Sequence, residues 1–439
     1  MVNLSDDIAV VIQAGGRGKR LREITGDSIP KPLAVMNGKT LIEWQIDALK
    51  RYEISEYVII IGYCGECIRE ILGDGSAYGI RIQYVEEKKP LGSAGALSIV
   101  SALIPNKTIL LVFGDVMFDM DLPRMLTFHR ARNALITLAM HPNSHPYDSD
   151  LLVENEEHCI IKILGKEEER TIYYKNLVNA GISIVEQDAL QNISVEQACD
   201  FEKDVIRPLL KEGRIYGYKT TEYIKDVGTV ERFRIAEEEQ KIGKWGKRNQ
   251  SNKQKCIFLD RDGTINVQKG LVGKPEDLIL YPRAVEAIKL FNQSEYLTIV
   301  VTNQPVVARG ICSIEDVELI HKKLETDLGA AGVYVDDIIF CPHHPDKGYP
   351  EENPKYKIVC NCRKPKTGMI DAMVHRYNID RKESYMIGDT TVDVQTGKNA
   401  GLKTILLHSG LAGADGKYDV QADQEAADLY EAAERILKR

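Results

Sequence analysis

Two closely spaced aspartates are the residues of this 439-residue chain best suited to chemistry. Asp260 and Asp262 stand two positions apart in FLDRDGT, directly after an apolar run. On an extended segment, residues i and i+2 point to the same side of the chain, about 6–7 Å apart. One carboxylate could therefore attack a phosphorus atom while the other protonates the leaving oxygen. Such pairs are common in surface loops, but here TN (302–303) and GDTTVD (388–393) also follow apolar runs.

A loop at 341–365, CPHHPDKGYPEENPKYKIVCNCRKP, gathers three cysteines and two adjacent histidines, and Arg363 and Lys364 follow the last cysteine. A disulfide knot, a redox pair and a metal site would each need such residues. The chain has nine cysteines, and its first residues show no export signal, so we expect a cytoplasmic location and reduced thiols. Because reduced cysteines form no disulfide bonds, the disulfide knot is the weaker of these interpretations.

A glycine-rich loop, AGGRGKRL (14–21), follows the first apolar run. Gly15, Gly16 and Gly18 would let the backbone approach an anion and present N–H groups to phosphates. The loop is neither a P-loop nor a G-x-G-x-x-G fingerprint in register, and glycine-rich turns are common. Further motifs in the same half strengthen the phosphate-binding interpretation: IPKPLAVMNGKTLIEW (29–44), LGSAGAL (91–97), FGD (113–115), NAGISIV (179–185) and KDVGT (225–229).

Parallel β-sheets must position these residues, because short apolar runs alternate with stretches of helix length. Runs that are apolar on both faces are typical of strands covered by helices on both sides. Helical segments such as 316–332 indicate βαβ units, and ligands bind beyond the carboxyl ends of such strands. We therefore expect an α/β fold with two doubly wound domains. The expected strands are 9–14, 57–61, 109–115 and 134–140, then 256–260, 297–303, 336–340, 384–389 and 402–408.

A polar, charged stretch at 236–255 separates the two groups of strands. We expect a first domain at 1–245, a linker at 246–254 and a second domain at 255–439. The net charge of −8 gives no global positive field that would attract nucleic acid or anionic lipid. No segment reaches the ~18 apolar residues of a membrane-spanning helix. We therefore expect small-molecule substrates, with neither nucleic acid nor membrane as partner, and the sequence leaves a homo-oligomer open.

The ordered motifs of the first half resemble those of the sugar-phosphate nucleotidyltransferases, over residues 8 to 235. The resemblance implies a Rossmann-like domain in which Arg20 and Lys31 hold the triphosphate and the sugar phosphate. Asp115 and Asp226 would bind Mg²⁺. No protein nucleophile is needed, because a sugar 1-phosphate oxygen attacks the α-phosphorus and pyrophosphate leaves. The barrier lies in bringing anions together and spreading their charge.

The motif LGSAGAL, in which Gly95 would bind substrate, resembles the form found in mannose-1-phosphate and heptose-1-phosphate guanylyltransferases, which implies GTP. Glu86 or Glu87 could accept hydrogen bonds from guanine, although a solvated strand end explains either residue equally well. The family often has Glu-Lys-Pro near the sugar phosphate, whereas this chain reads IIKILGKEEER there. Lys162 and Lys166 are both candidates for that contact.

In the second half, DRDGT with TN and GDTTVD resembles the haloacid dehalogenase superfamily of phosphatases, which implies a Rossmannoid fold. Asp260 would be the nucleophile and Asp262 the general acid and base. The resemblance further implies phosphoryl binding by Thr302 and Asn303, charge neutralisation by Lys364, and Mg²⁺ binding by Asp389 with Asp260 and the Asp262 backbone carbonyl. Asp393 would support that site, and Arg309, in TNQPVVARG, would reach a distal phosphate.

Within that superfamily, CPHHP and CNCRKP match the heptose bisphosphate phosphatases and the histidinol-phosphate phosphatases. The match implies one structural Zn²⁺ bound by Cys341, His343, Cys360 and Cys362. His344, next to His343, is the second choice of histidine. Four soft or borderline ligands suit a closed tetrahedral site. The loop has no apolar content to fold by itself, so zinc would fix where Arg363 and Lys364 point, and Arg363 would bind substrate.

Together the resemblances imply two steps of one pathway. The second half would remove the 7-phosphate of D-glycero-D-manno-heptose 1,7-bisphosphate, and the first half would transfer GMP from GTP to heptose 1-phosphate, giving GDP-heptose for lipopolysaccharide or S-layer glycan assembly. One alternative is a mannose or other hexose 1-phosphate nucleotidyltransferase fused to another sugar-phosphate phosphatase. Another is a phosphatase regulated by an inactive nucleotide-sugar-binding domain, against which the retained Arg20, Lys31, Asp115 and Asp226 argue.

Overall fold

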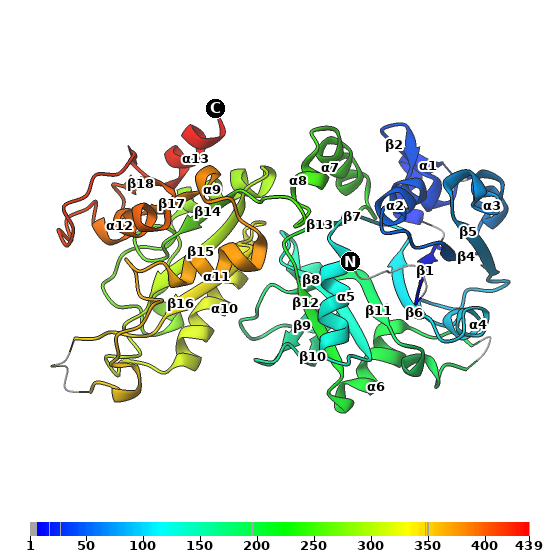
Figure 1. The fold of residues 1–439 in the computed structure, drawn as a ribbon, viewed down its shortest axis with the longest axis horizontal. Coiled ribbons are helices and arrows are strands. Elements are labelled where there is room, and N and C mark those ends of the chain that lie inside the picture. The colour runs from blue at the N-terminus through cyan, green and yellow to red at the C-terminus, as the bar shows by residue number, and fades with distance from the viewer. Residues whose placement is uncertain are drawn as a thin grey trace. The chain divides into compact units, whose positions relative to one another are not determined.

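The computed structural model of the chain describes residues 7–16, 18–26, 28–194, 197–346, 348 and 351–438 (Figure 1). The chain forms two compact units. The first unit comprises Met1–His141, Asp150–Gly165 and Val178–Asn249, and the second comprises Pro142–Ser149, Lys166–Leu177 and Gln250–Arg439. Two short segments of the first half of the sequence thus group with the second unit. Strands and helices alternate in both units, which confirms the expected α/β fold.

A nine-stranded mixed sheet forms the centre of the first unit, in the order β10-β9-β11-β6-β1-β4-β5, with β8 pairing to β11 and β12. Its parallel part consists of β1 (Ile8–Gln13), β4 (Glu56–Ile61), β5 (Arg81–Glu86) and β6 (Thr108–Phe113). The other strands are β8 (Ile136–His141), β9 (Leu151–Glu154), β10 (Ile160–Leu164), β11 (Val178–Val185) and β12 (Ile215–Lys219). All four strands expected here form, but β8 lies beyond β11, which runs antiparallel to both β6 and β8.

Helices cover this sheet and hold the turns that carry the motifs. They are α1 (Arg22–Thr25), α2 (Leu41–Lys50), α3 (Gly65–Leu72), α4 (Leu97–Leu103), α5 (Leu122–Ala131), α6 (Arg207–Leu209), α7 (Val230–Lys241) and α8 (Lys244–Lys247). The longer α2 begins at a capping box between Thr40 and Glu43. Its buried Gln45 donates to the carbonyls of Phe113 and Val116, both at 2.9 Å. The helix therefore fixes the turn that contains Asp115.

A two-stranded antiparallel ribbon of β7 (Val116–Asp119) and β13 (Tyr223–Asp226) pairs two segments of the first unit that are far apart in the sequence. Asp226 pairs with Val116 in this ribbon, and the Val227 N–H donates to the Asp115 carbonyl at 2.9 Å. Two predicted metal ligands that are far apart in the sequence therefore lie at adjacent strand ends. The short strands β2 (Val35–Met36) and β3 (Lys39–Thr40) form a separate hairpin.

A six-stranded parallel sheet forms the centre of the second unit, in the order β16-β15-β14-β17-β18-β19. The strands are β14 (Cys256–Leu259), β15 (Leu297–Asn303), β16 (Asp337–Cys341), β17 (Tyr385–Gly388), β18 (Lys403–Leu407) and β19 (Gln424–Ala426). The first five match the expected strands closely. The helices are α9 (Pro282–Gln293), α10 (Ile314–Ala330), α11 (Gly368–Tyr377), α12 (Thr391–Ala400) and α13 (Leu429–Leu437).

Strand β14 shows why this sheet is apolar on both faces. Ile257 and Leu259 belong to one hydrophobic cluster, whereas Cys256 and Phe258 belong to another, because successive side chains point to opposite faces. Each large apolar side chain buried in this way contributes about 1.5–3 kcal/mol. Since all strands of the sheet are parallel, their carboxyl ends share one edge. Asp260, Asn303 and Asp389 are placed along that edge by β14, β15 and β17.

The charged stretch at 236–255 packs within the two units, of which the first extends to Asn249 and the second begins again at Gln250. Trp245, in α8, is 7% exposed and stacks on Tyr223 with ring centroids 5.0 Å apart. Arg248 Nε donates to the Thr221 carbonyl at 3.1 Å, and Gln254 is buried in the second unit. One aromatic side chain thus orders a segment whose composition is otherwise typical of a solvated connection. None of the described helices combines the length and apolar composition needed to cross a bilayer.

Candidate active sites

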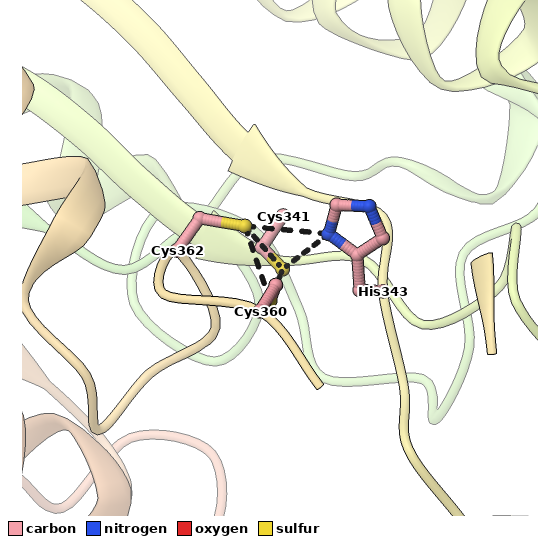
Figure 2. Close-up of side chains that lie close together, drawn as sticks. All are labelled: Cys341, His343, Cys360 and Cys362. Atoms are coloured by element: carbon pink, nitrogen blue, oxygen red, sulfur yellow. Dashed lines mark hydrogen bonds between the residues drawn. The ribbon is translucent and has the colours of Figure 1, made fainter. Parts of the chain in front are cut away.

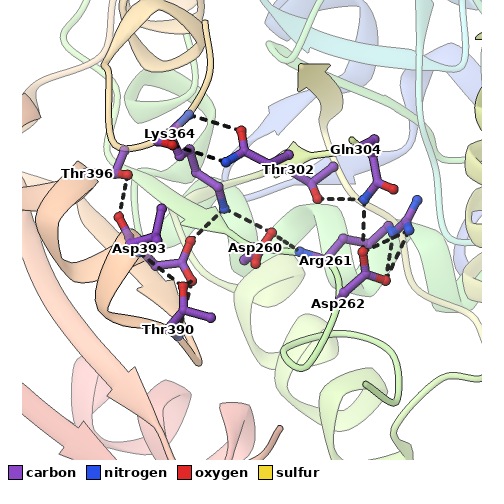
Figure 3. A network of polar contacts seen from close by, with 11 residues as sticks. Asp260, Arg261, Asp262, Thr302, Gln304, Lys364, Thr390, Asp393 and Thr396 are labelled. Carbon is purple, nitrogen blue, oxygen red and sulfur yellow. Dashed lines mark hydrogen bonds and ion pairs between the residues drawn. The ribbon is translucent and has the colours of Figure 1, made fainter. Parts of the chain in front are cut away.

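Three carboxylates and one lysine meet at the carboxyl edge of the second unit's sheet. Asp260, Asp389 and Asp393 each offer an oxygen, and these atoms lie within 4.8 Å of one another. Lys364 is 5% exposed, and its Nζ lies 2.9 Å from Asp260 Oδ1 and 2.6 Å from Asp393 Oδ1 (Figure 3). The structure therefore brings four sequence-predicted residues into one buried site.

The site carries more negative charge than Lys364 balances. Burial, with the nearby Asp393 and Asp262, raises the pKa of Asp260 to about 6 although Lys364 opposes the shift. Burial and the charge of Asp260 raise the pKa of Asp389 to about 7. Burial alone would lower the pKa of Lys364, but Asp260 and Asp393 outweigh it and raise that pKa. Carboxyl pKa values raised in this way are common where an enzyme binds a cation or handles protons.

The donor atoms of this cluster fit a hard divalent cation. Asp389 Oδ2 accepts from the Leu411 N–H at 2.7 Å, whereas Asp389 Oδ1 is buried and has no hydrogen-bond partner among the described residues. Carboxylate oxygens are the ligands that Mg²⁺ prefers. Asp393 lies within the cluster and also caps α12 by accepting from the Thr390 N–H at 3.2 Å. Asp262 does not contribute its carboxylate to the cluster within the described residues, and its backbone carbonyl stays the predicted ligand.

Asp262 is held on the side of the site away from Lys364. Its carboxylate accepts hydrogen bonds from Arg261 and Gln304 (Figure 3) and from Asn266. Gln304 Nε2 also donates to Thr302 Oγ1 at 2.9 Å. Sequence reasoning missed Gln304, although it directly follows the TN pair, because an amide beside a strand end has no distinctive spacing.

A cavity of about 160 Å³ opens over the carboxylates. Thr302, Asn303 and Arg363 line it together with the cluster. The Asn303 side chain donates from Nδ2 to the Lys364 carbonyl at 3.2 Å and accepts from the Lys364 N–H at 3.0 Å. Asn303 thereby also fixes the backbone that carries Lys364. Lys417 lines the same cavity, and nothing in the polar sequence around it distinguishes it from a solvated lysine.

The cysteine- and histidine-rich loop folds into a four-donor cluster. Cys341, His343, Cys360 and Cys362 each offer one ligand atom, and these atoms lie within 4.8 Å of one another (Figure 2). His343 Nδ1 lies 3.6 Å from Cys341 Sγ and 3.3 Å from Cys362 Sγ. Three sulfurs and one imidazole nitrogen that point at a common centre fit tetrahedral Zn²⁺.

His344 is not one of the four donors of this cluster. Its Nδ1 accepts from the Asp346 N–H at 3.2 Å. Burial and the charge of Arg363, with smaller effects of Arg309 and Lys357, lower the pKa of His344 to about 4. The geometry therefore favours His343 as the ligand, and it shows that three cations gather beside the loop.

The loop also anchors Arg363. The Arg363 N–H donates to Cys360 Sγ at 3.3 Å, and Arg363 Nη1 donates to the His343 carbonyl at 3.0 Å. Two of the four candidate zinc ligands thus hold Arg363 directly. Because Arg363 lines the cavity over the carboxylates, the loop sets the position of a cation in that cavity.

In the first unit, cations and carboxylates converge on Gly228 of the KDVGT motif. A Cβ atom added to Gly228 would lie 2.7 Å from Asp226 Oδ1, 3.1 Å from Arg20 Nη2 and 3.2 Å from Lys31 Nζ. Lys31 Nζ also lies 2.5 Å from Asp115 Oδ2. The four residues predicted to act in this half therefore come together.

The two aspartates of this site are partly exposed to solvent and form ion pairs with neighbouring cations. The Asp115 and Asp226 side chains are 33% and 39% exposed. Asp226 Oδ2 accepts from Arg232 Nη1 at 2.9 Å, a partner that sequence reasoning missed because it lies on α7, outside the motif. Two accessible carboxylates fit Mg²⁺ that keeps waters and takes further ligands from phosphates.

The glycine-rich loop approaches other parts of the unit closely. A Cβ atom on Gly15 would lie 2.6 Å from Glu87 Oε2, and one on Gly18, whose φ is +59°, would lie 2.7 Å from Lys31 Cβ. Gly16 faces open space, with nothing within 4 Å of such an atom. Glycine is therefore required at position 18 by its backbone conformation and packing, whereas Gly15 lies against the end of the Glu87 side chain, and the backbone at Gly16 is open to a ligand.

Glu87 is the better placed of the two candidate base readers. Its Oε1 is buried and has no hydrogen-bond partner among the described residues, and burial raises the pKa of Glu87. The Glu86 side chain is 57% exposed, and its Oε2 lies 3.8 Å from Arg69 Nη2. Gly95, predicted to bind substrate, lies in the neighbouring loop, where a Cβ atom would lie 2.5 Å from the Leu91 carbonyl oxygen.

The structure does not choose between Lys162 and Lys166. Lys162 is exposed on β10 of the first unit. Lys166 follows that strand and belongs to a segment that groups with the second unit. The contact of either lysine with a sugar phosphate stays a prediction.

Each half of the chain is similar in sequence to known proteins. The nucleotidyl transferase family model matches residues 9–241, and a HAD-hydrolase-like model matches residues 361–432. Over 228 residues, the chain is 31% identical to a mannose-1-phosphate guanylyltransferase of Mycobacterium tuberculosis. This match covers 52% of the chain and 62% of that relative, so the chain spans less than two thirds of the relative's length.

The second half matches phosphatases over most of their length. The chain is 38% identical over 160 residues to a D-glycero-beta-D-manno-heptose-1,7-bisphosphate 7-phosphatase of Haemophilus ducreyi, covering 36% of the chain and 85% of that protein. A crystal structure of D,D-heptose 1,7-bisphosphate phosphatase from B. bronchiseptica, complexed with magnesium and phosphate, is 31% identical. The match covers 42% of this chain and 99% of the solved chain, with a TM-score of 0.37.

Proposed function

The chain belongs to the nucleotidyl transferase family through residues 9–241 and to the heptose bisphosphate 7-phosphatases through its second half, and from this premise we propose a bifunctional enzyme of GDP-heptose synthesis. One site removes the 7-phosphate of D-glycero-D-manno-heptose 1,7-bisphosphate. The other transfers GMP from GTP to heptose 1-phosphate. The observation that carries the proposal is the buried contact of Lys364 with Asp260 in a cluster of three carboxylates.

In the phosphatase half, Asp260 is the nucleophile. A carboxylate oxygen of Asp260 attacks the phosphorus, the bond from phosphorus to the sugar oxygen breaks, and Asp262 gives a proton to that oxygen. Asp262 then takes a proton from water, which attacks the phosphorus of the aspartyl-phosphate and restores Asp260. Lys364 stays charged throughout and offsets the charge of the phosphoryl group. Mg²⁺ held by Asp260 and Asp389 would spread the charge on the phosphoryl oxygens.

The cations beside the zinc loop support binding of the second phosphate. Arg363 lines the cavity, and Arg309 and Lys357 lie close enough to lower the pKa of His344 between them. A substrate with phosphates at both ends would place one on Asp260 and the other near these cations. Zn²⁺ in the four-donor cluster would keep Arg363 in position without touching the reacting atoms.

In the nucleotidyltransferase half, the protein positions anions and supplies no nucleophile. Lys31 and Arg20 meet at Gly228, where they would hold the sugar phosphate and the triphosphate. The open backbone at Gly16 offers N–H groups to the phosphates. Mg²⁺ held by Asp115 and Asp226 would stabilise charge on the α-phosphate and the leaving pyrophosphate. Glu87, with one buried and unpaired oxygen, would accept from guanine N1–H and N2–H₂.

A product assay with single-site variants tests both activities. The chain is supplied with each anomer of heptose 1,7-bisphosphate, GTP and Mg²⁺, because phosphatase relatives are named for either anomer. Wild type should release phosphate and form GDP-heptose. Asp260→Asn should stop phosphate release yet convert added heptose 1-phosphate, and Lys31→Met should do the reverse. Loss of both activities in either variant would contradict two independent sites.

Two other functions make different predictions in the same assay. The Mycobacterium tuberculosis relative favours mannose 1-phosphate as the acceptor. When mannose 1-phosphate is added beside heptose 1-phosphate, GDP-mannose formed faster than GDP-heptose would support this alternative. An inactive first unit that regulates the phosphatase would release phosphate without forming any nucleotide sugar. The convergence of Arg20, Lys31 and Asp226 on one glycine favours an active site over this second alternative.

A further inference from the structure

The guanidinium of Arg261 lies directly behind the general acid of the phosphatase site. Arg261 is 0% exposed and is the largest fully buried side chain of the described residues. Its Nε lies 3.2 Å from Asp262 Oδ1, and its Nη2 lies 3.0 and 2.9 Å from Oδ1 and Oδ2 of the same carboxylate. A buried guanidinium without partners would be very unfavourable, so these contacts fix both groups.

The remaining arm of this guanidinium contacts a buried histidine. Arg261 Nη1 lies 3.2 Å from His321 Nε2, on α10. Since Nη1 can only donate, Nε2 must accept, which requires a neutral ring with its proton on Nδ1. Burial, with the charges of Arg261 and Lys175, lowers the pKa of His321 and agrees with this state. The ring also packs edge-on against Phe340, with centroids 5.1 Å apart.

Two amides complete the environment of the Asp262 carboxylate. Asn266 Nδ2 donates to Oδ1 and Gln304 Nε2 donates to Oδ2, both at 2.9 Å. Each oxygen therefore accepts from Arg261 and from one amide. Since the donors come from both sides, the carboxylate has a single favourable orientation.

We propose that Arg261, locked by His321, is a positioning residue that orients Asp262 for proton transfer. This proposal rests on the phosphatase activity proposed above. Asp262 must give a proton to the sugar oxygen as the bond from that oxygen to phosphorus breaks, and must later take one from water. An error of about 1 Å in the position of such a group can slow a reaction by about 10²-fold. His321 acts through Arg261 and touches neither substrate nor reacting atoms.

The alternative is a purely structural role, in which Arg261 and Asp262 form a buried ion pair that only stabilises the loop after β14. The two roles differ in their dependence on the leaving group. A sugar alkoxide needs a proton as it leaves, whereas p-nitrophenolate is a stable anion and needs none. The second step needs Asp262 as a base with either substrate, so the two roles are separated in single turnovers that follow release of the leaving group. In this first step a positioning role predicts selective loss with sugar phosphates, and a stabilising role predicts equal loss with both substrates.

A matched pair of His321 variants in the full chain tests the proposal. His321→Gln keeps an oxygen that can accept from Arg261, and His321→Leu has similar bulk without an acceptor. With Mg²⁺ and heptose 1,7-bisphosphate, we expect His321→Leu to lower kcat by about 10-fold or more at an unchanged KM, and His321→Gln to stay within about 3-fold of wild type. In single turnovers of p-nitrophenyl phosphate, release of p-nitrophenolate by both variants should stay within about 3-fold of wild type.

Arg261→Lys provides a second measurement, since it keeps the charge but loses the two-pronged contact. It should lower kcat for the bisphosphate by about 10- to 100-fold and slow the release of p-nitrophenolate in a single turnover much less. Equal losses on both substrates, or identical behaviour of His321→Leu and His321→Gln, would overturn the positioning role. A wild type that hydrolyses neither substrate would instead overturn the proposed phosphatase and, with it, this proposal.

Discussion

The ammonium group of Lys364 lies 2.9 Å from Asp260 Oδ1, deep in the second unit. The same nitrogen contacts Asp393 at 2.6 Å, so one cation pairs with both the proposed nucleophile Asp260 and Asp393, whose carboxylate is part of the capping box of α12. Asn303 holds the Lys364 backbone through two hydrogen bonds. The positive charge proposed to face a phosphoryl group is therefore held in place by the protein itself.

Removing this cation should destabilise the second unit as well as inactivate it. Lys364→Met leaves Asp260 and Asp393 buried without their partner, which we expect to cost about 3–5 kcal/mol of unfolding free energy in metal-free buffer. Chemical denaturation in the presence of a chelator measures the change. The control is Lys382→Met, on an exposed turn, which should behave as wild type. Equal stability of the two variants would contradict the role given to Lys364.

Mg²⁺ should offset the loss of stability that the metal-free second unit undergoes as pH rises. The pKa values of Asp260 and Asp389, about 6 and about 7, exceed the 3.8 of an ordinary aspartate. The folded metal-free protein therefore binds more protons than the unfolded chain, and this stabilisation is lost as pH rises from about 4 to about 7. Mg²⁺ competes with those protons, so it should raise Tm more at about pH 8 than at about pH 5.

Asp389→Asn is the control for that measurement, because it removes a carboxylate that titrates and would bind the metal. Its Tm should respond much less to Mg²⁺ at about pH 8. A wild-type Tm that responds equally to Mg²⁺ at both pH values would contradict the assignment of the cluster as a magnesium site.

Zinc should be present at about one ion per chain and should matter to only one activity. Cys362→Ser removes one of four donors, so we expect zinc content and phosphate release both to fall, while nucleotidyl transfer is retained. Metal analysis and the product assay give these quantities on the same sample. The control is Cys64→Ser, which changes a thiol of the first unit and should leave zinc content unchanged. Freshly purified protein without zinc would overturn the four-ligand assignment.

Glu87 should determine the preference for guanine. Glu87→Gln replaces one of two acceptor oxygens with a donor, so we expect kcat/KM for GTP to fall by about 10- to 100-fold with little change for ATP. Glu86→Gln is the matched control, since that neighbouring side chain is exposed and faces Arg69. Selectivity between GTP and ATP measures the effect. Equal results for the two variants would show that neither carboxylate reads the base.

The fold was predictable where apolar runs are uninterrupted. The strands expected at 297–303 and 384–389 correspond to β15 and β17, because central parallel strands are apolar on both faces. β5, with the sequence RIQYVE, interrupts its apolar residues with Arg81 and Gln83 at an edge of its sheet, and it is not among the expected strands. Trp245 lies in a stretch whose charge predicted solvation, yet it packs on Tyr223. Local composition misses such tertiary contacts.

The candidate sites were predictable where strand ends carry them. Asp260 and Asp389 follow parallel strands that are neighbours in the sheet, so their meeting follows from the pattern. The contact of Arg261 with His321 could not be foreseen, because His321 is one of several polar residues on α10 and only packing turns it inward. The same holds for Arg232, whose position on α7 gives no sign that it reaches Asp226.

The ribbon of β7 and β13 has a consequence for biosynthesis. Asp115 emerges from the ribosome long before Asp226, yet each needs the other's strand to be in place. A nascent or truncated chain that ends before β13 would hold the glycine-rich loop and Lys31 but only half of the acidic pair. We therefore expect guanylyl transfer to begin only after β13, the last strand of the first unit, has been translated and has paired with β7.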